Sequence, residues 1–136
     1  MPPNSGVIVF DAYAWVEYAL DSPKADKVAE LLENASEAIT PASVLAELKE
    51  SMLRHGIKTR IIKKIITYVK SLTTVVGIDS TVAELAGKLN FVHKRTTKDW
   101  GILDSFVYAT SKPYNGKVLT GDPHFKRLRK VNYIGA

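Results

Sequence analysis

The chain has 136 residues, a length that suits one domain with a sizeable buried core, so we expect a single domain over residues 1–136. Hydrophobic residues make up 46% and charged residues 24% of the sequence, which excludes an intrinsically disordered chain. The absence of cysteine excludes disulfides and thiolate metal sites, and no apolar run approaches the roughly 20 residues that span a bilayer.

The net charge of +5 comes mostly from lysine and arginine residues after position 48. Such a surplus favours a polyanionic partner, although solvated helix faces with ordinary lysine use explain it equally well. Residues 1–6 lack the basic region and cleavage site of a signal peptide. The sequence therefore predicts a cytoplasmic protein that does not act at a membrane.

Short apolar or β-branched runs alternate along the chain with longer segments of helical periodicity. In the first half, Val7–Phe10 predicts a buried strand. Pro41 suits the first turn of a helix that Gly56 ends. The elements predicted for this half are a strand at 7–10, helices at 12–20 and 24–34, a strand at 38–40, and helices at 41–55 and 59–71.

In the second half, Asp79 or Ser80 can cap a helix that extends to about His93. Residues 94–101 are polar and predict a loop, in which Asp99 would cap the next helix and Trp100 would be free to contact a substrate or partner. The other predicted elements are strands at 73–78, 117–120 and 131–134 and helices at 102–111 and 123–128. Strands alternating with helices predict an α/β fold with a parallel sheet covered on both faces.

Two aspartates directly follow predicted strands, Asp11 after Val7–Phe10 and Asp122 after the strand at 117–120. In a parallel α/β sheet, functional groups gather at the carboxyl ends of the strands, so these two side chains are expected at one edge. Each also suits a helix N-cap, and Pro123 after Asp122 strengthens that alternative. For each aspartate alone, the structural and functional interpretations are about equally strong.

Two further acids lie on apolar helical stretches. Val44 and Leu48 place Glu47 at the edge of an apolar stripe. Asp104 interrupts an apolar run, and aspartate is unfavourable in a helix interior, so we interpret it as functional. A carboxylate against apolar surface is costly unless it is paired, protonated or bound to a cation. One shared cation site would explain all four acids together.

A site of carboxylates without histidine or cysteine favours Mg²⁺ or Mn²⁺. With a basic surface to hold a polyanion, it indicates hydrolysis of phosphodiesters. The three histidines, His55, His93 and His124, are expected to be structural or at the surface. Trp15 and Tyr18, at helical spacing, are expected in the core.

Four segments carry a resemblance to a known family: residues 7–18, 40–48, 103–110 and 118–125. In this order they resemble the PIN-domain ribonucleases, specifically the VapC-type toxins of prokaryotic toxin–antitoxin pairs. The resemblance implies a three-layer fold with about five parallel strands, a homodimer, and a small antitoxin that blocks the site. It also implies a catalytic and metal-binding acidic quartet, accompanied by the hydroxyl of Thr120: Asp11, Glu47, Asp104 and Asp122.

The sequence departs from the family where small polar residues usually follow the first aspartate, because Ala12 and Tyr13 stand there. The leading hypothesis is a Mg²⁺- or Mn²⁺-dependent endoribonuclease toxin in which Asp11 and Asp104 are the principal ligands. Water would attack phosphorus in line and leave a 5′-phosphate and a 3′-hydroxyl. The alternatives are a stand-alone RNA-processing nuclease and a non-catalytic RNA-binding module of the same fold. A phosphatase of the haloacid dehalogenase type is disfavoured, since the second acid of its Asp-x-Asp motif is replaced by Tyr13.

Overall fold

The computed structural model describes residues 6–135, so both ends of the predicted domain, 1–5 and 136, lie outside the described part. Five strands pair in parallel to form one sheet in the order β3-β2-β1-β4-β5. This sheet confirms the predicted α/β class and the strand number that the family resemblance implied. The strands are β1 (Val7–Phe10), β2 (Glu37–Pro41), β3 (Thr74–Val76), β4 (Lys117–Thr120) and β5 (Val131–Tyr133).

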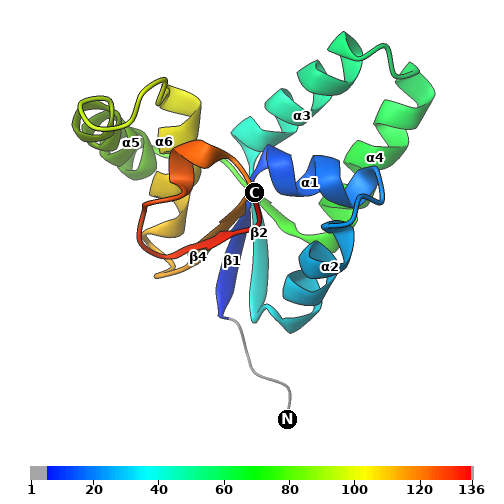
Figure 1. The fold of residues 1–136 in the computed structure, drawn as a ribbon, viewed down its shortest axis with the longest axis horizontal. Coiled ribbons are helices and arrows are strands. Elements are labelled where there is room, and N and C mark those ends of the chain that lie inside the picture. The colour runs from blue at the N-terminus through cyan, green and yellow to red at the C-terminus, as the bar shows by residue number, and fades with distance from the viewer. Residues whose placement is uncertain (1–5, 136) are drawn as a thin grey trace.

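Helices cover both faces of this sheet, which gives three layers (Figure 1). The connections from β1 to β2 and from β2 to β3 carry four helices on one face, and the connection from β3 back to β4 carries two on the other. Right-handed crossovers in opposite directions along the sheet produce this division. The helices are α1 (Ala12–Ala19), α2 (Ala25–Asn34), α3 (Ala42–Arg54), α4 (Thr59–Leu72), α5 (Ser80–His93), α6 (Ile102–Ser111) and the one-turn 3-10 helix η1 (Pro123–Phe125).

The order of the strands determines where a site can form. After β1 the chain crosses toward β2, whereas after β4 it continues toward β5, so it leaves these two adjacent strands in opposite directions. Such a switch opens a crevice outside the carboxyl ends of the strands. Asp11 directly follows β1, and Asp122 follows β4 by two residues, so both lie at this edge as the sequence predicted.

The core that supports this edge is centred on β1, whose residues after Val7 are fully buried. A continuous apolar strand is expected where helices cover both faces of a parallel sheet. Phe10 stacks on Trp15 of α1 with 5.0 Å between ring centroids, and Trp15 Nε1 donates a hydrogen bond to Thr40 Oγ1 at 3.1 Å. The end of β1 is therefore fixed against α1 and β2 directly before Asp11.

Two expectations for the loop before α6 are wrong. Gly101, not Asp99, is the N-cap of α6, and Asp99 adopts a left-handed φ of 63°. Trp100 is only 2% exposed; its Nε1 donates to Ser105 Oγ at 2.7 Å, and its ring lies 5.0 Å from that of Phe125. Trp100 is thus a core residue and offers no surface to a substrate.

Smaller differences concern the ends of elements. Pro41 closes β2 instead of beginning α3, because its ψ of 142° is extended. The helix predicted at 123–128 is shortened to the single turn of η1, and β3 and β5 are shorter than the predicted strands. Within residues 6–135, no helix has the length and apolar character needed to cross a membrane.

Candidate active site

Asp11 lies at the junction of β1 and α1 and caps the helix: its Oδ1 accepts a hydrogen bond from the Ala14 backbone N–H at 3.0 Å. The side chain of Thr120, the last residue of β4, hydrogen-bonds the same carboxylate. Thr120 Oγ1 also accepts from the Asp122 backbone N–H at 2.9 Å. Thr120 therefore links the two aspartates that follow neighbouring strands.

Asp122 caps η1 in the same manner. Its Oδ1 accepts a hydrogen bond from the His124 backbone N–H at 2.9 Å, and Pro123 occupies the first turn. Both aspartates are therefore helix N-caps, as the structural interpretation of the sequence predicted. Each cap engages Oδ1 of its aspartate.

Asp104 lies in the first turn of α6, not in the helix interior that the sequence suggested. Its Oδ2 accepts a hydrogen bond from the Gly101 backbone N–H at 3.0 Å. Acidic residues are favoured at this position because they satisfy a free N–H and complement the helix dipole. The helix-propensity argument for a functional Asp104 was therefore wrong, and its function must be argued from its neighbours.

One of these neighbours is His124, which the sequence predicted to be structural or at the surface and which lies beside two of the four acids. His124 Nδ1 lies 3.2 Å from Asp104 Oδ2 and 3.5 Å from Asp122 Oδ1. Ligand atoms of these three residues all lie within 4.8 Å of one another, the spacing of a metal site. The sequence offered one indication that His124 lies near the acids: it follows Asp122 by two residues, within one tight helical turn.

Glu47 enters the site from α3, between the fully buried side chains of Val44 and Leu48. Burial raises the pKa of the Glu47 carboxyl from 4.5 to about 7, and the negative charges of Asp104 and Asp122 act in the same direction. Sequence periodicity correctly placed Glu47 at the edge of the apolar stripe. Periodicity alone could not show which residues lie opposite.

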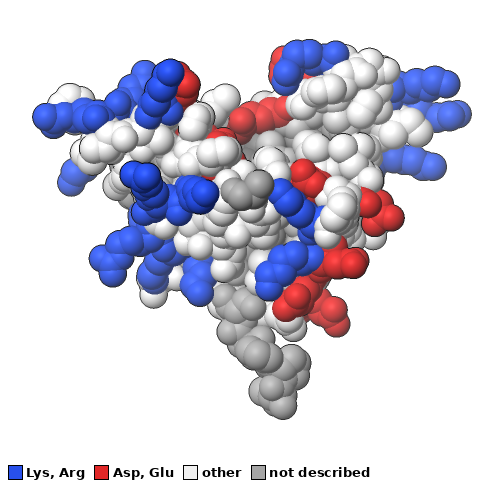
Figure 2. Space-filling model, in the orientation of Figure 1, with Lys and Arg blue, Asp and Glu red and all other residues white. Residues whose placement is uncertain are grey.

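The four acids line one cavity of about 170 Å³, with Ala12, Tyr13, Val107, Pro123 and Phe125 as its other walls. Figure 2 shows acidic atoms in a hollow between two lobes of the molecule, whose outer surfaces carry many lysine and arginine side chains. Comparison with Figure 1 identifies the lobes as α3–α4 and α5–α6. Asp11 and Glu47 share this cavity but lie outside the tightest group of ligand atoms.

The electrostatics of the cavity favour a cation. Burial raises the pKa of Asp11 from 3.8 to about 7 despite hydrogen bonds from Thr120 and Ala14, which lower it. Burial also raises the pKa of Asp104, against the hydrogen bond from Gly101. Several carboxylates that share one partly dry cavity repel one another unless they bind protons or a metal ion. Their oxygen donors suit Mg²⁺ or Mn²⁺, and the imidazole of His124 adds a nitrogen donor that Mn²⁺ accepts more readily.

The fold and this cavity define a class: an α/β protein with an acidic site at the carboxyl edge of a parallel sheet. The sequence of residues 8–131 matches the family model of the PIN domain. The match spans most of the chain, so the chain belongs to the PIN domain family. Comparison with curated protein sequences finds no match.

Solved structures show the same fold at low sequence identity. The VapBC2 complex of Rickettsia felis, bound to a promoter DNA fragment, contains a chain that is 16% identical, with a TM-score of 0.73 over 92% of this chain and 95% of that one. A toxin–antitoxin complex from Klebsiella pneumoniae contains one at 14% identity and TM-score 0.69, over 91% and 94%. VapC20 of Mycobacterium tuberculosis, a toxin that cleaves the sarcin-ricin loop, matches at 14% identity and TM-score 0.70, over 88% and 92%.

Proposed function

We propose that the chain acts as a single PIN domain and is a divalent-metal-dependent endoribonuclease, the VapC-type toxin of a toxin–antitoxin pair in the cytoplasm. The observation that carries the proposal is the convergence of four acids from separate elements on one cavity. Membership of the PIN family and the fold shared with VapC proteins support the same activity. The basic lobes beside the cavity suit a polyanionic substrate such as RNA.

In the proposed reaction, Asp104, Asp122 and His124 would hold a divalent metal ion, and Asp11 would complete the site from the end of the adjacent strand. A divalent ion supplies positive charge for the phosphate oxygens and lowers the pKa of water. Glu47 has a carboxyl pKa of about 7, so its carboxylate can accept the proton of an attacking water at neutral pH. Thr120 keeps Asp11 and Asp122 in position by hydrogen-bonding both.

An antitoxin partner is the second part of the proposal. Two apolar pockets of about 410 and 270 Å³ lie beside each other on α1, and both include Ala19 and Ile65. Tyr68 and Leu20 at these pockets are 53% and 66% exposed. Such a surface suits an apolar segment of a partner. The similar chains from Rickettsia felis and Klebsiella pneumoniae come from toxin–antitoxin complexes, which supports this partner.

A homodimer is the third part. Phe91 and Val92 at the end of α5 are 68% and 46% exposed, and Ile102 and Leu103 at the start of α6 are each 43% exposed. A second copy that packs on these apolar side chains would cover them. This arrangement is an expectation from the family resemblance.

Asp104→Asn tests the nuclease proposal. We expect the wild-type protein to cleave RNA in the presence of Mn²⁺ or Mg²⁺ and to leave 5′-phosphates. EDTA should abolish this cleavage. Asparagine keeps the acceptor for Gly101 and removes the charge, so α6 should stay folded while cleavage falls to background. Cleavage is measured by mapping RNA ends after inducible expression, and folding by circular dichroism. Undiminished cleavage by Asp104→Asn would refute the site, and metal-independent RNA binding without cleavage would favour the non-catalytic module.

A further inference from the structure

Tyr13 stands in the cavity wall where the resemblance leads one to expect a small polar residue. Its side chain lies over Gly121, which connects β4 to Asp122. A Cβ atom at Gly121 would overlap the Tyr13 ring, so the glycine provides the space that the ring occupies. The phenol is therefore a fixed part of the acidic cavity, and its function is not explained by metal binding.

Lys24, at the start of α2, makes the polar contact of this phenol. The Lys24 ammonium lies 3.0 Å from the Tyr13 hydroxyl and 5.4 Å from the centre of its ring. The hydroxyl accepts this hydrogen bond, so its own hydrogen remains available for donation. Two N–H groups of the ammonium also remain available. The Tyr13 hydroxyl and the Lys24 ammonium thus offer hydrogen-bond donors next to the acidic cavity, whose wall includes Tyr13.

Lys24 has no carboxylate within ion-pair distance among residues 6–135. Lys27, one turn further along α2, instead pairs with Glu30 at 3.6 Å. The hydrogen bond to Tyr13 raises the pKa of Lys24, so the ammonium is charged at neutral pH. A charged lysine held by a neutral phenol keeps its charge available for an anion.

A second lysine–tyrosine pair lies along the same side. Lys126, directly after η1, places its ammonium 5.8 Å from the centre of the Tyr133 ring. Tyr133 lies near Gly121, because a Cβ atom at Gly135 would meet both the Tyr133 hydroxyl and the Gly121 carbonyl oxygen. Both Lys24 and Lys126 therefore lie beside a tyrosine near the β4–η1 connection.

We propose that the Lys24 ammonium and the Tyr13 hydroxyl bind a backbone phosphate of single-stranded RNA that flanks the scissile phosphate. The inference rests on the proposed nuclease function and adds the contact that aligns the strand with the acids. Lysine binds phosphate as a point charge, and a hydroxyl donor next to it fixes the position of one oxygen. The acids would otherwise repel the RNA backbone, so a fixed cation beside them favours correct placement.

The test compares Lys24→Ala with Lys27→Ala, which removes a lysine from the same helix outside the cavity. Both are made in wild type for cleavage and in Asp104→Asn for binding of a fluorescent single-stranded RNA. We expect Lys24→Ala to weaken binding about fivefold to tenfold at low salt, and to reduce the slope of log affinity against log salt by about 0.7. Tyr13→Phe should weaken binding less, Lys24→Arg should largely restore it, and Lys27→Ala should match the parent.

Equal affinities and salt slopes for Lys24→Ala and Lys27→Ala, with cleavage by wild type intact, would overturn this inference and leave the nuclease proposal standing. If wild type cleaves no RNA, the nuclease proposal fails, and the binding arm still decides whether Lys24 contacts RNA. Melting temperatures of all variants exclude misfolding as the cause of a loss. Tyr13→Phe provides an independent test of the phosphate contact if Lys24→Ala proves unstable.

Discussion

Asp11 carries the clearest electrostatic cost of the site, because it is 7% exposed and lies near the charges of Asp122 and Glu47. Its hydrogen bonds with Ala14 and Thr120 reduce this cost without removing it, since its pKa is still raised to about 7. Sites that bind metal ions commonly hold such uncompensated charge at the expense of stability. In the metal-free protein, neutralising Asp11 should therefore stabilise the fold.

The sign of this effect depends on pH. The pKa of Asp11 is raised from 3.8 to about 7 on folding, so the folded state binds the proton more tightly. The associated stability is present below pH 4 and is lost as pH rises toward and through 7. Asp11→Asn avoids this loss, and asparagine can still cap α1. We expect it to raise the free energy of unfolding by about 2–3 kcal/mol more at pH 8 than at pH 5.

Urea unfolding in EDTA at the two pH values measures this difference. Glu84→Gln, which removes an exposed carboxylate on α5, is the matched control; it keeps Asp11, so its stability should follow the pH profile of wild type. Parallel pH profiles for wild type and Asp11→Asn would show that burial does not raise the pKa of Asp11 as described.

Site residues could be predicted from the sequence where their place follows from the end of a strand, and not where it depends on contacts between distant residues. Asp11 and Asp122 could be predicted because the ends of adjacent parallel strands meet. Asp104 was singled out for a wrong reason, because the helix correctly predicted at 102–111 already placed it in the first turn, where aspartate is favourable. His124 was missed because its ring meets Asp104, which is 20 residues away in sequence.

At the scale of elements, the segment from the end of β4 to η1 joins the Tyr13 side of the cavity to its acidic side. It contains Thr120, which hydrogen-bonds Asp11; Gly121, which supports the Tyr13 ring; and Asp122, which caps η1. The periods of strands and helices predicted the elements on both sides of this connection. They could not predict its contact with Tyr13, because that contact joins β4 to α1 across the sheet edge.

Gly121→Ala tests this contact between elements. The added methyl group would overlap the Tyr13 ring, which must turn away and release Lys24. We expect a loss of about 1–2 kcal/mol in unfolding free energy, typical of overpacking. RNA binding should weaken as in Lys24→Ala. In Gly121→Ala combined with Tyr13→Ala, the coupling energy should be about 1 kcal/mol, measured by a double-mutant cycle of urea unfolding. Simple additivity would show that the ring and the glycine do not pack as described.

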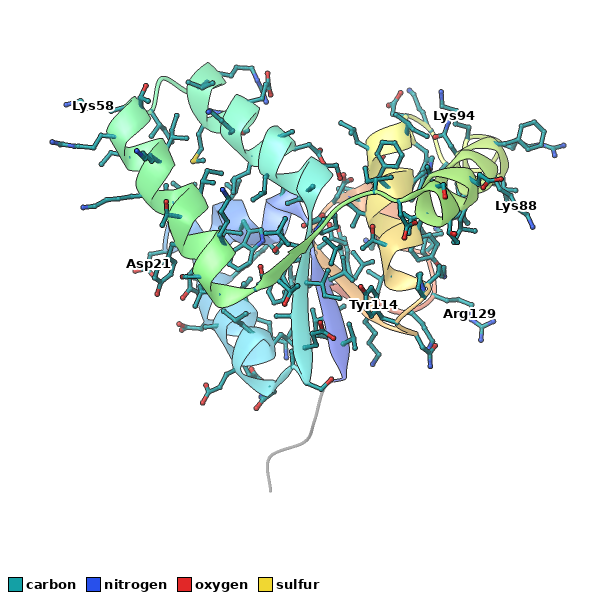
Figure 3. The ribbon with its side chains drawn as sticks, turned by 180° about the vertical axis from the view of Figure 1, so that it is seen from behind. Asp21, Lys58, Lys88, Lys94, Tyr114 and Arg129 are labelled. Atoms are coloured by element: carbon teal, nitrogen blue, oxygen red, sulfur yellow. The ribbon has the colours of Figure 1, made fainter. Side chains whose placement is uncertain are left out.

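At the scale of the whole molecule, the acidic hollow lies between the α3–α4 lobe and the α5–α6 lobe (Figure 2). Seen from behind, Lys58 points outward from the α3–α4 lobe, whereas Lys88 and Lys94 point outward from the α5–α6 lobe (Figure 3). The lysines predicted to hold RNA are therefore spread over both lobes instead of forming one patch. The alternation of strands and helices was sufficient to predict the layers, but the distribution of charge required the folded chain.

A divalent ion bound as proposed would link the layers of the fold. Glu47 comes from α3 and Asp104 from α6, on opposite faces of the sheet, and the two aspartates after β1 and β4 lie between them. A ligand that binds only the folded state stabilises it by mass action, by about 2.7 kcal/mol at 100 times its dissociation constant. Mn²⁺ should therefore raise the melting temperature of the whole molecule relative to EDTA.

Glu47→Gln should reduce this Mn²⁺-dependent rise, because it removes a negative charge that α3 places in the cavity beside the proposed metal site. Glu50→Gln, one turn further on α3, removes an exposed carboxylate that pairs with Arg54 at 3.1 Å, so its metal-dependent rise should equal that of wild type. Thermal unfolding with Mn²⁺, with Mg²⁺ and with NaCl at equal ionic strength separates specific binding from screening. An equal rise in Glu47→Gln and Glu50→Gln would remove Glu47 from the site, and a rise no larger than that in NaCl would refute the metal site altogether.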